Sequence, residues 1–175
     1  KPDTNNPIYL TFNMLHKPCL LGILGAIVGE KGFQNYGVMP EYYQKLKSIK
    51  VSIAPLKENG KTYHENGNFT KTVIKYNNTT GLASEEESGN LMITEQTLVA
   101  PAFKCWILLN LEREIEAKLY NFLKENKAEY LPYLGKNEFS LWWDNFNEYE
   151  YEPFYPNEEF QINSLFIKEE TVKEG

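Results

Sequence analysis

An apolar run interrupted by glycines, residues 20–29, constrains the fold of this chain more than any other segment. Pro18 suits the first turn of a helix, because the N–H that proline lacks would have no helical partner there. Residues 20–28 are apolar on every side, so the helix that they predict should be buried. The run is too short for a membrane-spanning helix, which needs about twenty apolar residues.

The glycines of this run, Gly22, Gly25 and Gly29, fall on nearly one face of the predicted helix. A residue without a Cβ atom lets another backbone pack very close. Two interpretations remain open, namely contact between the helix and a sheet, or close approach of a ligand backbone at this face. The spacing is not that of a dinucleotide-binding fingerprint, which also requires a preceding strand.

Alternating and amphipathic patterns predict the other elements. They are a short helix at 41–48, strands at 49–56, 70–76, 91–99 and 103–109, and an amphipathic helix at 111–127. The polar, turn-rich residues 57–90 are expected to form a long hairpin that projects from a single α+β domain, residues 1–175. With one further strand before Pro18, the order becomes the β-α-β-β-α-β plan of ferredoxin-like domains. That plan hosts many functions and does not decide among them.

The last part of the chain combines a glycine turn with an acidic, aromatic segment. Residues 133–139 predict a compact turn around Gly135. Partial alternation at 141–160 predicts a strand or hairpin, so 141–175 is interpreted as a C-terminal strand region. Trp142 and Trp143 are expected in the core, and Tyr149–Tyr155 would suit either a core or a partner surface.

The formal net charge of −6 argues against a protein that coats nucleic acid by charge alone, although it leaves room for a local basic groove. Arg113 is the only arginine, so phosphate contacts would fall mainly to lysine. Two cysteines without a CxxC motif and two distant histidines predict neither a zinc site nor another cofactor. Cysteines in apolar runs, Cys19 and Cys105, fit buried thiols in a reduced, cytoplasmic setting.

Three segments together resemble the CRISPR-associated Cas-five family, nearest to its type I-B branch. Leu20–Ala26 (LLGILGA) resembles the first helix of the family, Glu95–Pro101 (EQTLVAP) resembles a family strand, and Pro132–Glu138 (PYLGKNE) resembles the turn after the second helix. The resemblance covers residues 1 to about 168. Family members begin with a strand that this chain lacks and continue further, so we expect a piece truncated at both ends.

The resemblance implies a ferredoxin-like RNA-binding domain of the RAMP (RRM-like) kind, in which residues 57–90 would be the extended hairpin called the thumb. The implied role is non-catalytic: to hold the 5′ handle of CRISPR RNA in a type I Cascade surveillance complex for antiviral defence. The implied neighbours are the repeated backbone subunit and the large subunit. Target DNA would be met only through the complex, since base pairing with the guide reads its sequence.

Holding a single-stranded RNA end requires cations for phosphates, hydrogen-bonding groups for bases and 2′-hydroxyls, and planar faces for stacking. The residues that would supply them are His16, Lys17, Lys71, Lys75, Gln96, Lys104, Tyr133, Lys136 and Asn137. His16 and Lys17 precede the first helix, where free N–H groups favour an anion. A solvated lysine beside a packed histidine is the alternative.

The other candidates also have plain structural interpretations. Lys136 and Asn137 lie on the glycine turn, which would be purely structural if Asn137 satisfies local backbone groups. Tyr133 would stack on a base or anchor the core. Gln96 and Lys104 lie on predicted strands. Lys71 and Lys75 alternate along a hairpin strand, so they line a groove or a solvated face.

Two other functions remain open. One branch of the family cleaves repeat RNA without a metal, with a tyrosine, a lysine and a histidine as acid and base. His16–Lys17 and Tyr63–His64 look suitable for this, but neither pair lies at the matching family position, so we expect no catalysis. A protein-interaction module without an RNA role would fit the net charge of −6.

Overall fold

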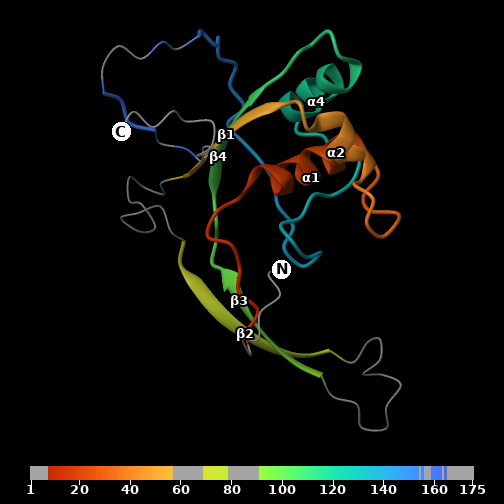
Figure 1. Ribbon diagram of the computed structural model, residues 1–175, viewed down its shortest axis with the longest axis vertical. Coiled ribbons are helices and arrows are strands. Elements are labelled where there is room, and N and C mark those ends of the chain that lie inside the picture. The colour runs from red at the N-terminus through yellow and green to blue at the C-terminus, as the bar shows by residue number, and fades with distance from the viewer. Residues whose placement is uncertain are drawn as a thin grey trace. The chain divides into compact units, whose positions relative to one another are not determined.

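The computed structural model describes residues 8–56, 69–78, 91–153, 155, 159–162 and 164. Their contacts group the chain into two compact units, one with Lys1–Leu15 and Ala54–Lys104, the other with His16–Ile53 and Cys105–Gly175. Two helices, four strands and a further helix follow one another in the order α1 (Lys17–Val28), α2 (Glu41–Leu46), β1 (Lys50–Pro55), β2 (Lys71–Asn78), β3 (Leu91–Leu98), β4 (Phe103–Leu108) and α4 (Glu114–Lys124) (Figure 1). This mixture confirms the predicted α+β class.

The strands form two small sheets, one of β1 with β4 and one of β2 with β3. Strand β2 pairs antiparallel with β3, from Lys71 opposite Leu98 to Asn78 opposite Leu91. The hairpin predicted at 57–90 therefore has its second strand beyond that range, while 57–68 and 79–90 lie outside the described residues. Phe69 packs edge-on against Phe103, with ring centroids 4.9 Å apart.

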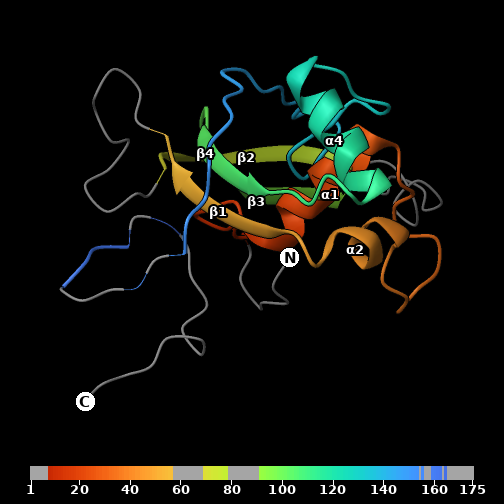
Figure 2. The ribbon, with the colours of Figure 1, turned by 90° about the horizontal axis from the view of Figure 1, so that it is seen from above.

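The core of the second unit lies around α1. Leu21, Leu24 and Ile27 are almost fully buried, together with Leu46 of α2 and Leu119 of α4. Figure 2 shows α1 next to α2 and α4. The all-round apolar pattern of α1 thus corresponds to burial between helices, as its lack of a polar face predicts.

Glycines of α1 pack against the ring of Tyr42 in α2. A Cβ atom built on Gly25 would lie 2.5 Å from the Cβ atom of Tyr42, and one on Gly22 would lie 3.5 Å from its hydroxyl oxygen. The expected close approach is present, but the partner is a helix and not a sheet. The contact is between helices because Tyr42 of α2 lies over the bare backbone of α1.

Helix α1 ends in a left-handed turn at Gly29, whose φ is 84°. The Gly29 N–H donates to the carbonyl oxygen of Ala26 at 3.3 Å, and the Glu30 N–H donates to that of Gly25 at 2.8 Å. This pair of bonds is the Schellman motif, for which glycine is the preferred residue.

Helix α4 and the segment after it hold the same end of α1. Lys118 Nζ donates to the carbonyl oxygen of Val28 at 2.8 Å. The Glu129 N–H donates to the carbonyl oxygen of Ile27 at 2.9 Å. These bonds satisfy carbonyl groups that a helix end leaves without a partner inside the helix.

The only arginine joins the start of α4 to the last turn of α2 and to Ser48 just after it. Arg113 donates to Ser48 Oγ at 2.7 Å and to the backbone carbonyl oxygen of Lys45 at 2.9 Å. It also forms an ion pair with Glu116, whose side chain is 3% exposed and which accepts the Asn110 N–H at 2.7 Å. The Arg113 side chain therefore has a structural role, since it links α4 to α2 and Ser48.

Three sequence predictions for the second unit are wrong. The amphipathic helix begins at Glu114 and not at Leu111, which is 54% exposed and outside the buried face. Residues 141–153 form neither a strand nor a helix. Trp142 is 80% exposed, whereas Trp143 is partly buried and donates its indole N–H to the carbonyl oxygen of Leu123 at 2.9 Å. Trp143 and Phe146 of this segment pack on α4 in place of a strand partner.

Candidate nucleic-acid interface

The hairpin β2–β3 gathers three of the candidate residues on one face. Successive strand residues point to opposite faces, so Lys71, Val73 and Lys75 share a face. Gln96 lies directly opposite Val73 in the antiparallel register, and its side chain therefore belongs to the same face, between the two lysines. We call this set the lysine face of the hairpin.

Within the hairpin residues that the structure describes, the lysine face carries two ammonium groups and no carboxylate. Within the described hairpin residues, 71–78 and 91–98, Glu95 is the acidic residue, and the register places it on the opposite face, 5% exposed. There the Tyr76 hydroxyl donates to Glu95 Oε2 at 3.4 Å. The lysine face is thus locally electropositive in a chain whose formal charge is −6.

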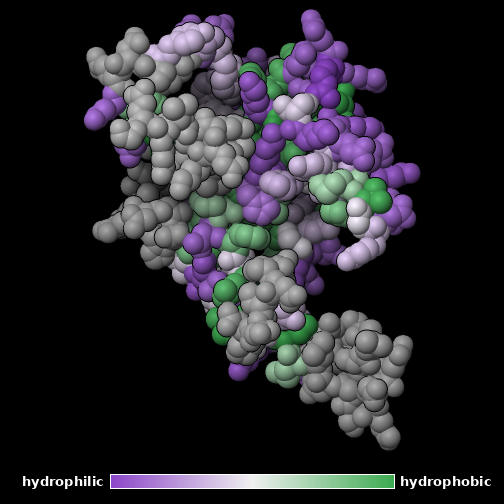
Figure 3. All heavy atoms as spheres, in the orientation of Figure 1, coloured by the Kyte–Doolittle hydropathy of each residue, from purple (hydrophilic) through white to green (hydrophobic). Residues whose placement is uncertain are grey.

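Two exposed apolar side chains share this face, Val73 between the lysines and Met92 beyond Lys75. Val73 is 51% exposed and Met92, in register with Asn77, is 57% exposed. In Figure 3 hydrophobic side chains (green) reach the surface over this hairpin. A surface that combines ammonium groups, an amide and exposed apolar atoms can meet phosphates, base edges and base faces together.

Backbone bonds from the N-terminal segment fix the strand that carries Gln96. The Tyr9 N–H donates to the carbonyl oxygen of Thr94 at 2.9 Å, and the Gln96 N–H donates to that of Tyr9 at 2.8 Å. This parallel bridge pairs β3 on the edge away from β2. Part of the segment before Pro18 therefore behaves as a short strand partner.

Lys104 does not belong to this group. It is exposed on β4, which pairs with β1, whereas Lys71, Lys75 and Gln96 lie in the other sheet.

At the start of α1 the histidine is a helix cap. His16 is the N-cap residue, and its Nδ1 accepts the N–H of Cys19 at 3.4 Å. The Leu20 N–H donates to the carbonyl oxygen of His16 at 3.0 Å, and Pro18 has no N–H. These partners occupy N–H groups that were expected to receive a phosphate, so an anion here would rely mainly on Lys17, which is partly buried.

The glycine turn after α4 displays an aromatic ring. Tyr133 pairs with Ser140 in an isolated bridge, and the Leu134 N–H donates to the carbonyl oxygen of Phe139 at 2.8 Å. Gly135 has a φ of 88°, a backbone conformation that favours glycine. The predicted turn is therefore confirmed.

Side chains on this turn are accessible to different extents. Tyr133 is 48% exposed, so the ring does not anchor the core. Asn137 is exposed and Lys136 is partly exposed. The turn thus holds a stacking surface, an amide and a cation within a few residues of one another.

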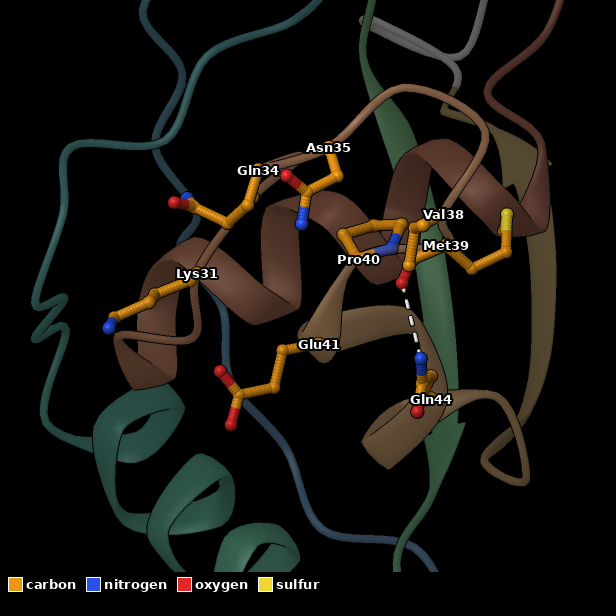
Figure 4. Close-up of a pocket in the computed structure, with 9 residues that line it drawn as sticks. Lys31, Gln34, Asn35, Val38, Met39, Pro40, Glu41 and Gln44 are labelled. Atoms are coloured by element: carbon orange, nitrogen blue, oxygen red, sulfur yellow. Dashed lines mark hydrogen bonds between the residues drawn. The ribbon is translucent and has the colours of Figure 1, made fainter.

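A small pocket with apolar and polar lining, which none of the sequence patterns considered above indicated, lies between the loop after α1 and helix α2 (Figure 4). Its volume is about 230 Å³, and carboxamides of Gln34, Asn35 and Gln44 line it together with Lys31 and Glu41. The Gln44 amide donates to the carbonyl oxygen of Met39 at 3.2 Å. The pocket is smaller than the roughly 300–1,000 Å³ typical of small-molecule sites. In the sequence, the one sign of this pocket is that Gln34 and Asn35 lie between two glycines, Gly32 and Gly37.

Beside this pocket Lys45 is paired with two carboxylates. Lys45 Nζ lies 2.8 Å from Glu30 Oε2 and 2.7 Å from Glu41 Oε1. Hydrogen bonding to Glu30 and Glu41 raises the pKa of Lys45, and hydrogen bonding from Lys45 lowers the pKa of Glu41. Lys45 is therefore a poor phosphate ligand, in contrast to the lysine face.

The structure describes only some of the residues considered for RNA cleavage. Tyr63 and His64 lie outside the described residues. Among the residues that the structure describes, no three His, Cys, Asp or Glu side chains are grouped to hold a metal ion. Within the same residues no helix has the length and hydrophobicity to cross a membrane. Of the two cysteines predicted to be buried, Cys19 is exposed.

No protein-family model matches this chain, and no curated protein matches its sequence.

Proposed function

We propose that this chain is a non-catalytic RNA-binding subunit of the Cas-five kind, which holds the 5′ handle of CRISPR RNA in a cytoplasmic type I Cascade complex. The observation that carries the proposal is the lysine face, where Lys71 and Lys75 flank Gln96 without a carboxylate on the same face of the described hairpin. A single-stranded RNA needs this combination of backbone cations and base-contacting groups.

The order of the elements supports a ferredoxin-like fold as part of the proposal. Strands β1 and β4 pair although the hairpin β2–β3 lies between them in sequence. Helix α1 precedes β1 and α4 follows β4. A thumb hairpin inserted between the second and third strands, in chain order, of a β-α-β-β-α-β domain would have this arrangement.

The glycine turn supplies a second contact in the proposal. Tyr133 would stack on a base, and the side chains of Lys136 and Asn137 would contact a phosphate and a base edge. Stacking of a base on an aromatic side chain contributes about 1–3 kcal/mol and tolerates any base. In this account Gly135 is required because its left-handed backbone turns these side chains toward the same short stretch of RNA.

Cleavage of the RNA is the less favoured alternative. A histidine that acts as general acid or base must reach the reacting oxygen atoms. His16 uses Nδ1 to cap α1, and this bond orients the imidazole along the helix end. We therefore assign His16 to capping and the function to binding alone.

Fluorescence anisotropy with a labelled RNA of the 5′ handle tests the proposal. Lys75→Gln and Thr72→Glu each change the net charge by one unit in the same direction, and they lie on opposite faces of β2. The proposal predicts a threefold to tenfold weaker affinity for Lys75→Gln and less than a twofold change for Thr72→Glu. Equal effects of the two variants, or absence of binding by the parent chain with its neighbouring subunits, would refute it.

Incubation of the same RNA with the protein separates the alternatives. An intact RNA after prolonged incubation supports a binding subunit. Site-specific cleavage in the presence of EDTA that His16→Ala abolishes would identify a metal-independent nuclease instead.

A further inference from the structure

An extended segment after the glycine turn, residues 141–153, lies along α4 without forming a strand, and we call it the acidic strap. Three of its side chains attach it to the helix. Trp143 donates to the Leu123 carbonyl oxygen, as described above. Phe146 packs edge-on against Tyr120 with ring centroids 5.8 Å apart. Glu148 accepts the Tyr120 hydroxyl at 2.7 Å and forms an ion pair with Lys124 at 2.8 Å. The strap is thus held in a defined position.

Three aromatic side chains of the strap are at least half exposed. Trp142 is 80% exposed, Tyr149 is 54% exposed and Tyr151 is 50% exposed. Tyr155, just beyond the strap, is 79% exposed. Exposed tryptophan and tyrosine are enriched at the centres of protein interfaces, where they provide much of the binding energy.

The charge of the strap has one sign. Between Lys136 and Lys168 the sequence contains no lysine, arginine or histidine. The acidic residues in that interval are Glu138, Asp144, Glu148, Glu150, Glu152, Glu158 and Glu159. Asp144, Glu150 and Glu152 are exposed. This charge repels a phosphate backbone and attracts a basic partner.

The cation that suits the strap best is arginine, and the one arginine of this sequence is already paired elsewhere. Arginine stacks on aromatic rings and pairs with carboxylates through two N–H groups, so it suits a surface of alternating tyrosines and glutamates. The single arginine, Arg113, is held by Glu116 and Ser48. Lys124 is held by Glu148.

We propose that the acidic strap is a docking site for a protein surface that carries exposed arginine side chains. Trp142, Tyr149 and Tyr151 would receive the guanidinium groups and apolar contacts, while Glu150 and Glu152 would pair with their charge. The proposal does not depend on RNA binding by the lysine face, since it rests on other residues.

Anisotropy of a short labelled peptide in which arginine alternates with leucine tests this docking site on the full chain. The same peptide with glutamate in place of arginine is the specificity control. The protein variants are Trp142→Ser and Glu150→Gln/Glu152→Gln. The control for the tryptophan variant is Tyr36→Ser, because the Tyr36 ring is fully exposed. The control for the double variant is Glu112→Gln/Glu114→Gln, because both carboxylates are exposed near the start of α4.

The expected result is saturable binding of the arginine peptide alone, weakened at least fivefold by each strap variant and less than twofold by each control. The thermal unfolding midpoint of Trp142→Ser should equal that of the parent, because the ring is mostly in solvent. Absence of peptide binding, or equal losses in strap and control variants, would overturn the proposal. A fivefold loss of handle-RNA affinity in Trp142→Ser would overturn it too, because the strap would then contact RNA. If the peptide binds as expected but the RNA does not bind, the result counts against the lysine face and leaves the docking site supported.

Discussion

Gly25 of α1 and Tyr42 of α2 are so close that a Cβ atom on the glycine would lie 2.5 Å from the Cβ atom of the tyrosine and 2.8 Å from its Cγ. Real Cβ atoms essentially never approach heavy atoms of residues distant in the chain to less than 3.0 Å. The glycine run is therefore explained by helix packing. The same contact positions the loop that lines the small pocket, because that loop joins the two helices.

Replacing Gly25 with alanine should destabilise the protein despite the better helix propensity of alanine. Propensity alone would favour alanine by about 0.5–1 kcal/mol. The clash with Tyr42 requires α1 and α2 to separate, at a cost of about 1–3 kcal/mol for an overpacked core. Urea unfolding measures the net change, which we expect to be a loss of 1 kcal/mol or more.

Gly22→Ala provides a control on the same helix face. Its Cβ atom would meet the Tyr42 hydroxyl oxygen at 3.5 Å, an ordinary contact. We expect this variant to be neutral or slightly stabilising. Equal destabilisation by Gly22→Ala and Gly25→Ala would show that the proximity of Tyr42 is not the cause.

Glu116→Gln should lower the free energy of unfolding by about 1–3 kcal/mol, because it removes a buried charge-assisted partner of Arg113. Glu116 is 3% exposed and also accepts the Asn110 N–H. Glu114→Gln, at an exposed position in the first turn of the same helix, should change stability by less than about 0.5 kcal/mol. Chemical denaturation of both variants checks this, and similar losses would argue against the arginine network.

Tyr133→Ala should weaken handle-RNA binding by about 1–3 kcal/mol if the ring stacks on a base. Tyr133→Phe keeps the ring and should retain affinity within about twofold. Leu131→Ala is the matched control, since Leu131 is 74% exposed and close in sequence but offers no planar face. Anisotropy measurements in which Leu131→Ala and Tyr133→Ala behave alike would remove Tyr133 from the RNA interface.

Stability should fall between pH 9 and pH 11 because of Cys105. Burial raises the pKa of this thiol from 9.0 to about 11. The folded state therefore retains a proton that the unfolded state loses, and the stabilisation present below pH 9 disappears as pH rises to 11. Two pKa units correspond to at most about 2.7 kcal/mol.

Unfolding curves of the parent and of Cys105→Ala between pH 8 and pH 11 isolate this effect. The loss with rising pH should be smaller in the variant, whereas Cys19→Ala should keep the part due to Cys105. A parallel decline in the parent and Cys105→Ala would mean that other groups cause it.

Local patterns were sufficient to predict most of the helices and strands. Pro18 and the apolar run predicted α1, and the alternation of Val51 and Ile53 predicted β1. The start of α4 was placed too early because Asn110 forms a turn with Glu112, whose N–H donates to the Asn110 side chain at 3.0 Å. A turn of this kind competes with the helix and has only a weak sequence signal.

Long-range partners were beyond the reach of sequence patterns. Arg113 meets Ser48 across 65 positions, and no local spacing indicates that contact. The prediction of a strand at 141–160 was wrong because Trp143 and Phe146 pack on α4. Such a contact between distant parts of the chain leaves no trace in the alternation of residues. For the candidate site, alternation correctly placed Lys71 and Lys75 on one face, but only the register with β3 brought Gln96 between them.

The salt dependence of handle-RNA affinity tests the central claim most directly. For single strands, each phosphate neutralised contributes about 0.7 to the slope of log affinity against log salt concentration. If the lysine face binds the RNA backbone, Lys71→Gln/Lys75→Gln should reduce this slope by about 1.4. Lys47→Gln/Lys50→Gln, which changes the net charge equally at exposed sites elsewhere, should leave the slope unchanged. An unchanged slope in Lys71→Gln/Lys75→Gln would contradict the account.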